Sequence, residues 1–424
     1  MRKVVITGLG MRTSIGPDVT TCWRGLVSGQ SGIRRISRWD PSQYSVRVAA
    51  EAPRYSREDL DLKSFPAGSY RKSVRLFEAV AREAFLDAGL SRHPIPVSSI
   101  GVAAGASVNY LDMRLLRQYF RFRRSGKFTL DVAWCAREGA QRREAFYRRV
   151  GDMIASVPAR VLRLGGPCFV MDTACAASAH AIGEAYRMVS RGEVEAMVAG
   201  GSAALVSPLS ILAFSLIGAL SRSENPDEAS RPFDRRRDGF VMGEGAGAVV
   251  LESWESARER GAPVYAELAG YASTLNAFNL TDPSPSGQSE AQTMKMALAD
   301  AGMAPEEVSY IAAHGTSTPK NDAAETAAIK SVFGPHAGRL MVSSNKGQLG
   351  HTISAAGVCN LICAVKAITE GIVPPTMNLN HADPECDLDY VANRSRPAKV
   401  RAALANAFAF GGQNAVLAVR ATAG

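Results

Sequence analysis

One of the seven cysteines stands where a nucleophile could act. An apolar run from Val170 leads into small residues and Cys175, which Ala-Ala-Ser-Ala-His and a helical pattern follow. A cysteine at the first turn of a helix faces unsatisfied backbone N–H groups and the positive end of the helix dipole, and both favour the thiolate. Its small neighbours leave room for a substrate. On this segment alone, a buried structural cysteine is an equally good interpretation.

Two histidines in polar turns could act beside such a sulfur. His314 ends an apolar run and precedes Gly-Thr-Ser-Thr, which supplies the hydroxyls of Thr316 and Thr318. His351 follows a glycine-bearing turn that contains Lys346 and precedes a helix of small residues. A lone histidine is usually a satisfied polar residue, so each motif is weak evidence by itself.

A glycine turn near the C-terminus completes the set. Gly411 and Gly412 follow Phe410 between two apolar runs, and such a turn can present backbone N–H groups to a developing oxyanion. A thiol, two histidines and this turn suit acyl-thioester chemistry. Their convergence in space does not follow from the sequence.

The elements that must position these residues alternate between strands and helices. This order predicts an α/β fold with buried, mostly parallel strands. It runs through two similar halves, 1–255 with the cysteine and 256–424 with both histidines, and no low-complexity linker divides them. Strands are expected at 3–8, 100–105, 168–173, 196–200, 246–252, 265–271, 308–313, 340–344, 401–408 and 414–420, and helices at 176–191, 290–302, 322–333 and 353–370.

Composition narrows the classes of function. The chain has 424 residues, 46% of them hydrophobic, and can bury a large core. Its cysteines include no CxxC pair, which favours the cytoplasm, and Cys359 and Cys363 are interpreted as core residues and not as metal ligands. No apolar run of about 18 residues predicts a membrane span. The net charge is +9, but no nucleic-acid-binding motif accompanies it.

The four chemical segments resemble those of the β-ketoacyl-acyl carrier protein synthases, of the elongating type found in fatty acid and type II polyketide synthesis. The resemblance covers nearly the whole chain apart from about 107–160. Three further segments carry it: Val4-Val-Ile-Thr-Gly-Leu-Gly, Arg231-Pro-Phe-Asp-Arg-Arg-Arg-Asp-Gly-Phe-Val-Met-Gly-Glu-Gly-Ala-Gly and Pro374-Pro-Thr-Met-Asn-Leu. It implies a thiolase fold, a five-layered α-β-α-β-α sandwich of two βαβαβαββ halves, which is normally a homodimer or a heterodimer with a related ketosynthase-like subunit.

The resemblance also implies a role for each motif. Cys175 would take an acyl group from the phosphopantetheine arm of an acyl carrier protein, and no cofactor would be resident. His314 and His351 would promote decarboxylation of a malonyl thioester, and the N–H groups of Cys175 and Phe410 would hold the oxyanion. The presence of two histidines favours the elongating class.

Further residues match supporting positions of the family. Lys346 and Glu325 are expected to form an ion pair, Thr316 and Thr318 to hold the pantetheine arm, and Phe410 to act as a gate. The turn departs from the family by having Ala409 where glycine is common. Because alanine tolerates a positive φ less well, the gate is expected to move differently.

The basic charge is concentrated in an insertion at about 107–160 that has no obvious strand and is expected to be largely helical. Residues 111–150 hold eleven Arg and Lys against four Asp and Glu. One hypothesis is that these cations dock an acidic carrier protein, since rim charges mainly raise the association rate. A surface insertion without a partner is an equally good interpretation. The docking candidates are Arg121, Arg123, Arg124 and Lys127.

The product class stays open. A synthase for a polyketide or another specialised acyl product is favoured modestly over a housekeeping fatty-acid elongation synthase. A non-catalytic chain-length partner would lack the nucleophile, so Cys175 argues against it. A degradative thiolase would need a second cysteine near Gly412.

Overall fold

The computed structural model describes residues 1–53, 71–92, 95–107, 120–122, 128–130 and 153–422. All ten strands expected from the sequence are present, with ends that differ by up to five residues. The strands of the first half are β1 (Val4–Thr13), β4 (Ile100–Gly105), β7 (Cys168–Met171), β8 (Ala196–Ala203) and β9 (Gly245–Ser253). Those of the second half are β10 (Ala266–Leu275), β11 (Tyr310–Ala312), β12 (Met341–Ser343), β15 (Ala402–Phe408) and β16 (Gln413–Arg420).

These strands form one ten-stranded sheet in the order β12-β11-β15-β16-β10-β1-β9-β8-β4-β7. Each half pairs its strands in the same way: β1–β9 and β9–β8 are antiparallel, as are β10–β16 and β16–β15. The outer pairs β8–β4, β4–β7, β15–β11 and β11–β12 are parallel. An antiparallel pairing of β1 with β10, at Val5 and Glu267, joins the halves.

The expectation of mostly parallel strands holds for direction within each half, where four of the five strands run the same way, although the pairings around the last strand are antiparallel. In each half the last strand returns between the first and the fourth, and it runs against both. Helices cover the strands on both faces, so most of their residues are apolar and buried, whichever way the strands run. The apolar runs therefore revealed the strands but not their directions.

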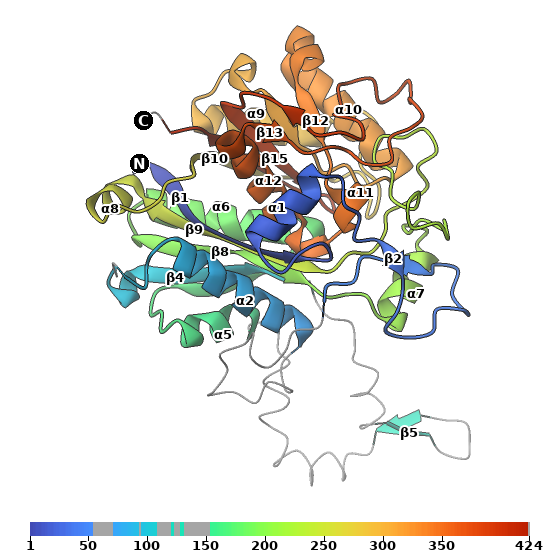
Figure 1. Cartoon of the computed structure of the whole chain (residues 1–424), viewed down its shortest axis with the longest axis horizontal. Coiled ribbons are helices and arrows are strands. Elements are labelled where there is room, and N and C mark those ends of the chain that lie inside the picture. Colours follow the sequence, from blue (N-terminus) through green and yellow to red (C-terminus); the bar gives the residue numbers. More distant parts are fainter. Residues whose placement is uncertain (54–70, 93–94, 108–119, 123–127, 131–152, 423–424) are drawn as a thin grey trace.

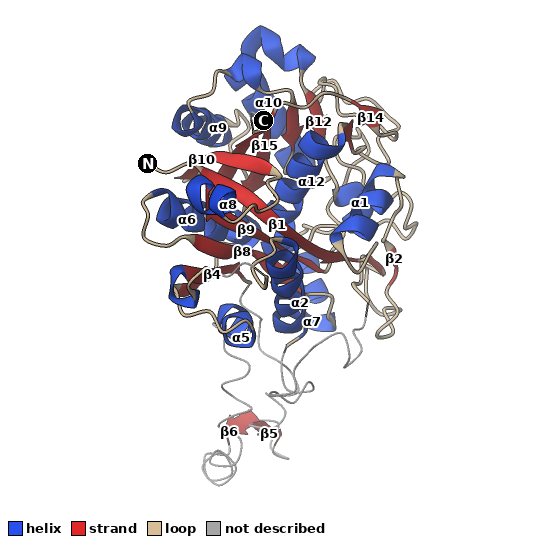
Figure 2. Cartoon of the chain, turned by 60° about the vertical axis from the view of Figure 1, so that its left-hand side comes forward, coloured by secondary structure: helices blue, strands red, loops and turns tan. Residues whose placement is uncertain are grey.

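Five layers follow from the way the helices cover the sheet (Figure 1). Two helices lie between the half-sheets: α6 contacts β4 and β8, α12 contacts β15, and α6 and α12 contact each other. Helices α2 and α5 cover the outside of the first half, and α9 and α10 the outside of the second (Figures 1 and 2). This is the predicted α-β-α-β-α sandwich. The helices are α2 (Lys72–Asp87), α5 (Met153–Val161), α6 (Ala177–Ser190), α9 (Gln288–Ala301), α10 (Pro319–Phe333) and α12 (Ala356–Glu370).

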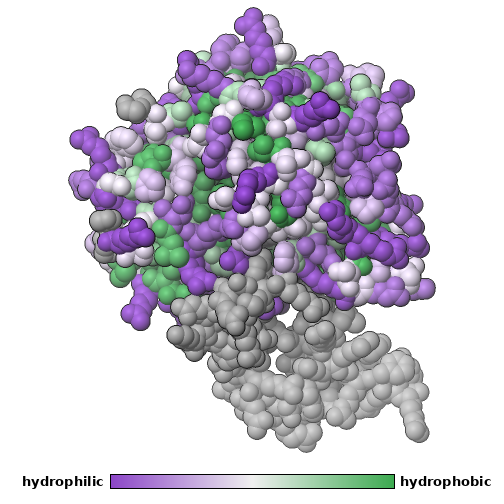
Figure 3. Space-filling model, viewed as in Figure 1, coloured by the Kyte–Doolittle hydropathy of each residue, from purple (hydrophilic) through white to green (hydrophobic). Residues whose placement is uncertain are grey.

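One described stretch, Ile353–Glu370, is a helix long and apolar enough to cross a membrane by length and composition. It contains α12, and 78% of it is buried inside the protein. The face of the molecule in Figure 3 is largely hydrophilic, with hydrophobic residues gathered only in small groups. The apolar character of α12 is thus explained by its place in the central layer.

The remaining elements are short, with two to nine residues each. In the basic insertion, β5 (Phe120–Phe122) pairs with β6 (Phe128–Leu130), so the expectation that this region has no strand is wrong. Arg121 lies on β5, whereas Arg123, Arg124 and Lys127 lie outside the described residues. The other elements are α1 (Val19–Val27), β2 (Arg34–Arg35), β3 (Val48–Ala49), α7 (Pro208–Leu216), α8 (Trp254–Glu259), α11 (Lys346–Leu349), β13 (Ile372–Val373) and β14 (Arg396–Pro397).

Candidate active site

A short 3₁₀ turn, Ala174–Ala176, places Cys175 directly before α6. Cys175 is 5% exposed. Ala174 has a φ of +46°, a backbone conformation that costs free energy for any residue other than glycine. Local strain of this kind, immediately before a reactive side chain, is common at functional sites. The predicted position of the cysteine at the start of a helix is confirmed.

His351 is held by the corresponding turn of the second half. The 3₁₀ turn Ile353–Ala355 precedes α12, and Ile353 has a φ of +42°. The N–H of Ile353 donates to Nδ1 of His351 at 3.2 Å, so Nε2 is the nitrogen that carries the proton in the neutral ring. Nε2 lies 3.1 Å from Sγ of Cys175. His351 therefore presents a hydrogen-bond donor to the sulfur.

His314 follows β11 and completes the group. Its ring centroid lies 5.3 Å from that of His351, and its Nδ1 is buried without a hydrogen-bond partner among the described residues. Glu325 accepts hydrogen bonds from the N–H groups of His314, at 2.8 Å, and Gly315, at 2.7 Å. Lys346 donates through Nζ to the carbonyl oxygen of His314.

The expectation of an ion pair between Lys346 and Glu325 is wrong. Among the described residues, the structure shows no ion pair between these two side chains. Both side chains contact the backbone of His314 from different sides. Their charges still interact, because Glu325 raises the pKa of the buried Lys346, which burial lowers. The two residues thus fix the histidine through its backbone.

Burial controls the protonation of the three groups. It raises the pKa of the Cys175 thiol to about 11, although the Lys346 ammonium and the backbone N–H groups of Phe410 and Cys175 act in the opposite direction. Burial, with the charge of Lys346, holds the pKa values of His314 and His351 well below the usual range. Both rings are therefore neutral near pH 7 and the thiol is protonated. The backbone N–H groups around the sulfur do favour the thiolate, as expected, but desolvation of the sulfur acts more strongly in the opposite direction.

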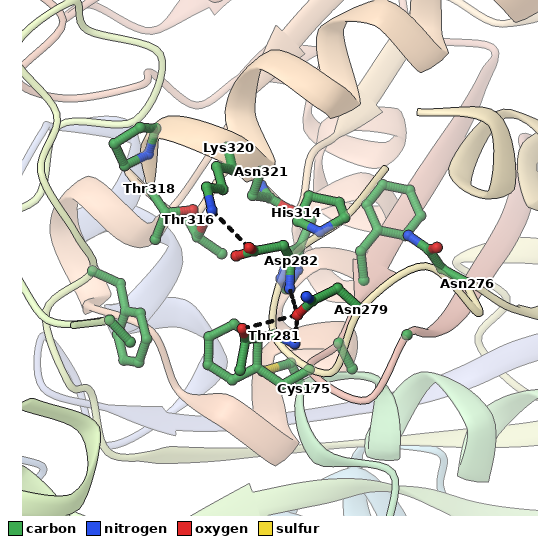
Figure 4. A pocket seen from close by; sticks show the side chains of 18 of the residues that line it. Cys175, Asn276, Asn279, Thr281, Asp282, His314, Thr316, Thr318, Lys320 and Asn321 are labelled. Carbon is green, nitrogen blue, oxygen red and sulfur yellow. Dashed lines mark hydrogen bonds and ion pairs between the residues drawn. The ribbon is translucent and has the colours of Figure 1, made fainter. Parts of the chain in front are cut away.

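The three side chains line one cavity of about 310 Å³. Thr316, Thr318 and Phe410 line the same cavity, and the two threonine hydroxyls are 2.8 Å apart. In Figure 4, Cys175 lies at the bottom of the view, with the two threonines and Lys320 at the top. The residues predicted from separate motifs are thus brought together.

The glycine turn lies over the sulfur. Gly411 and Gly412 have φ values of +85° and +80°. A Cβ at Gly412 would lie 2.0 Å from the carbonyl oxygen of Asn276, whose N–H donates to the Gly412 carbonyl. Ala409 is not among the residues with a positive φ, so alanine is accommodated there without strain.

Two supporting residues were not singled out from the sequence. Asp322 accepts hydrogen bonds from the N–H groups of Thr316, at 2.9 Å, and Ser317, at 3.1 Å, and so shapes the loop after His314. Asn406 donates to Glu325 at 3.0 Å. The available signal was an asparagine inside a buried strand, where polar residues are rare.

The same three side chains could in principle bind a metal ion. Cys175, His314 and His351 each have a ligand atom within 4.8 Å of the others. However, the N–H of Ile353 occupies Nδ1 of His351 and leaves Nε2 protonated, and a protonated nitrogen has no lone pair for a metal. The geometry favours a hydrogen-bond donor directed at the sulfur.

Comparison with known proteins agrees with this geometry. The profile of the β-ketoacyl synthase N-terminal domain matches residues 1–257, and that of the C-terminal domain matches residues 265–380. The chain belongs to the β-ketoacyl synthase family. The ketosynthase is 41% identical to a 3-oxoacyl-[acyl-carrier-protein] synthase 2 of Synechocystis sp., over 99% of this chain and 98% of the relative. A synthase of the same name from Coxiella burnetii is 39% identical over 98% of each chain.

Solved structures extend the similarity to polyketide synthases. A ketosynthase in a complex with its type II polyketide synthase acyl-carrier protein, AntDE:AntF, is 34% identical and superposes with a TM-score of 0.88 over 100% of both chains. The ishigamide ketosynthase/chain length factor is 34% identical with a TM-score of 0.85, also over 100% of both chains. The predicted family, fold and acyltransferase class are confirmed.

Proposed function

We propose that this ketosynthase joins an acyl group held on Cys175 to a malonyl unit on an acyl carrier protein, with loss of CO₂. The observation that carries the proposal is the protonated Nε2 of His351, 3.1 Å from the Cys175 sulfur, in a buried cavity that His314 also lines. Such an arrangement provides a nucleophile and fixed hydrogen-bond donors in one cavity.

Acyl transfer comes first. The Cys175 sulfur attacks the thioester carbonyl of the acyl-carrier protein, and the thioester oxygen becomes negative. The backbone N–H groups of Cys175 and Phe410, which face the sulfur, hold that oxygen. The bond to the carrier sulfur then breaks, and the proton of the Cys175 thiol ends on the carrier thiol. This exchange transfers one proton from the Cys175 thiol to the carrier thiol and is neutral overall.

Condensation follows in the same cavity. Malonyl thioester loses CO₂, and the negative charge moves to the thioester oxygen as an enolate. The neutral rings of His351 and His314 hold this oxygen by hydrogen bonds. One fixed donor of this kind contributes about 3 kcal/mol. The enolate carbon attacks the acyl-Cys175 carbonyl, the Cys175 sulfur leaves, and it regains a proton from solvent.

An acyl carrier protein is the proposed partner. Its phosphopantetheine arm is part of the substrate and is not a cofactor that stays bound to the ketosynthase. The hydroxyls of Thr316 and Thr318 line the cavity and suit the amides of such an arm. Support also comes from the AntDE:AntF complex, in which a ketosynthase was solved with its acyl-carrier protein. The relatives include both 3-oxoacyl-[acyl-carrier-protein] synthases and a polyketide ketosynthase, and the proposal covers both product classes.

We also propose that the ketosynthase pairs with a second ketosynthase-like chain. Strand β7 ends the ten-stranded sheet, and its Phe169, Val170 and Met171 are only half-buried, as expected for an edge that meets another subunit. The ishigamide relative is a ketosynthase/chain length factor.

The buried Cys359 and Cys363 are free thiols, which supports the proposed location in the reducing cytoplasm.

The test is product formation from purified components. With an acyl-carrier protein and malonyl-carrier protein, mass spectrometry should show a β-ketoacyl product two carbons longer and release of CO₂. His351→Ala and His314→Ala should each lower the yield strongly. His336→Ala, which changes a histidine bonded to the carbonyl of Val308 outside the cavity, should leave it unchanged. Full activity in either cavity variant would refute the proposed roles.

A further inference from the structure

A buried carboxyl group lines the active-site cavity, and the reaction described above does not use it. Glu290 belongs to the first turn of α9, is 2% exposed, and lines the same cavity as Cys175 and both histidines. Neither the sequence motifs nor the proposed chemistry gives this residue a role. A carboxyl group in such a place costs free energy unless a partner compensates it.

One oxygen of Glu290 has a partner and the other has none. Oε1 accepts a long hydrogen bond, 3.4 Å, from the side-chain amide of Asn276. Asn276 is itself engaged elsewhere, since its Oδ1 accepts from the N–H of Phe278 at 3.1 Å. Oε2 is buried and has no hydrogen-bond partner among the described residues. Buried polar atoms are nearly always paired, so an unpaired one in a cavity wall points to a ligand.

A capping role at the start of α9 does not account for this oxygen. The N–H of Gly287, from which a glutamate in the first turn could accept, donates to the carbonyl of Ser284 instead. Burial raises the pKa of the Glu290 carboxyl, and its own backbone N–H and Asn276 only counter this effect. Oε2 itself remains without a hydrogen-bond partner among the described residues.

The position of Glu290 connects it to the glycine turn. Asn276, which holds Oε1, also donates its backbone N–H to the carbonyl of Gly412. A ligand at Oε2 would thus lie in the part of the cavity that the turn borders, and not against a remote surface.

We propose that Glu290 is a substrate-binding residue whose Oε2 accepts a hydrogen bond from an N–H or O–H group of the thioester substrate. The inference rests on the proposed function, because it takes the cavity to be the one that receives thioesters. Two parts of the substrate could supply the donor. A pantetheine arm carries amide N–H groups and a hydroxyl, whereas an acyl chain supplies a donor only where it bears a hydroxyl.

The test compares substrates that differ only in donors, in wild type, Glu290→Gln and Glu290→Met. Methionine fills a similar volume without an acceptor, and glutamine keeps the shape but loses the charge. Gln288→Ala, on the exposed side of the same helical turn, is the control for damage to α9. Decarboxylation is measured with malonyl-pantetheine and with malonyl S-methyl thioester, which has no N–H or O–H donor. Loading of Cys175 is measured with saturated and with hydroxylated acyl-carrier proteins.

If the donor lies on the pantetheine arm, Glu290→Met should lower kcat/KM for malonyl-pantetheine about tenfold relative to that for the S-methyl thioester. Glu290→Gln should lower the same ratio by a smaller factor. If the donor lies on the acyl chain, the ratio of hydroxylated to saturated loading should fall by a similar factor. Both ratios unchanged in Glu290→Met, whose folding is checked by its rate with the S-methyl thioester, would overturn the inference. A wild-type protein that neither decarboxylates nor loads any thioester would instead refute the proposed function.

Discussion

Gly411 and Gly412 form a matched pair at which one added methyl group should have different consequences. Their φ values are +85° and +80°, so alanine meets similar backbone strain at both, about 1–2 kcal/mol. The space around them differs. A Cβ at Gly411 has no atom within 4 Å, whereas a Cβ at Gly412 lies 2.0 Å from the backbone oxygen of Asn276.

The clash cannot be relieved by a side-chain rotation, because the contacted atom belongs to the backbone. Either Asn276 or the turn must move, and the hydrogen bond from the N–H of Asn276 to the carbonyl of Gly412 is then lost. Such a bond contributes about 1 kcal/mol. We therefore expect Gly412→Ala to lower the free energy of unfolding by at least about 1 kcal/mol more than Gly411→Ala does.

The same displacement should affect catalysis. Moving the turn takes the N–H of Phe410 away from the Cys175 sulfur, and loss of one oxyanion donor lowers rates about 10²–10³-fold. Stability is measured by urea unfolding and the rate of acyl loading by intact mass. Equal effects of Gly411→Ala and Gly412→Ala on both quantities would show that contact with Asn276 does not fix the turn.

Three further predictions concern single groups. Because the pKa of the Cys175 thiol is about 11, the reactive thiolate fraction should grow throughout the range from pH 7 to pH 9. Alkylation of Cys175 by iodoacetamide should therefore speed up about tenfold per pH unit in this range. An alkylation rate that levels off below pH 8 would contradict this prediction. His351→Ala removes the Nε2–H donor and should slow malonyl decarboxylation, measured as CO₂ release, about 10²–10³-fold. A decrease of less than tenfold in this rate would count against the assigned tautomer. The ion pair of Lys320 with Asp282, 67% and 33% exposed, should contribute less than about 1 kcal/mol to stability; a larger loss in Asp282→Asn on urea unfolding would be inconsistent with its exposure.

The positions of the strands were predictable because each is a short apolar run bounded by small or turn-forming residues. Their neighbours and directions were not. The pairing of β1 with β10 joins residues more than 250 positions apart, and nothing within either run specifies its partner. The β5–β6 hairpin was missed because its flanking charges obscured two three-residue strands.

The types of residue in the site followed from chemistry and resemblance, whereas their interactions did not. The protonation of Cys175 depends on a competition between burial and the N–H groups around the sulfur, and burial is a property of the whole fold. The roles of Lys346 and Glu325 depend on which backbone atoms of His314 each one reaches. Glu290 lies outside the motifs, and only the cavity revealed it.

The most direct test of the central claim is the intact mass of the ketosynthase after incubation with a panel of acyl-carrier proteins. The wild-type chain should gain the mass of one acyl group and lose it on addition of malonyl-carrier protein, and Cys175→Ala should gain none. Loading that persists in Cys175→Ala, or a wild-type chain that no carrier protein acylates, would contradict the assignment of Cys175 as the nucleophile.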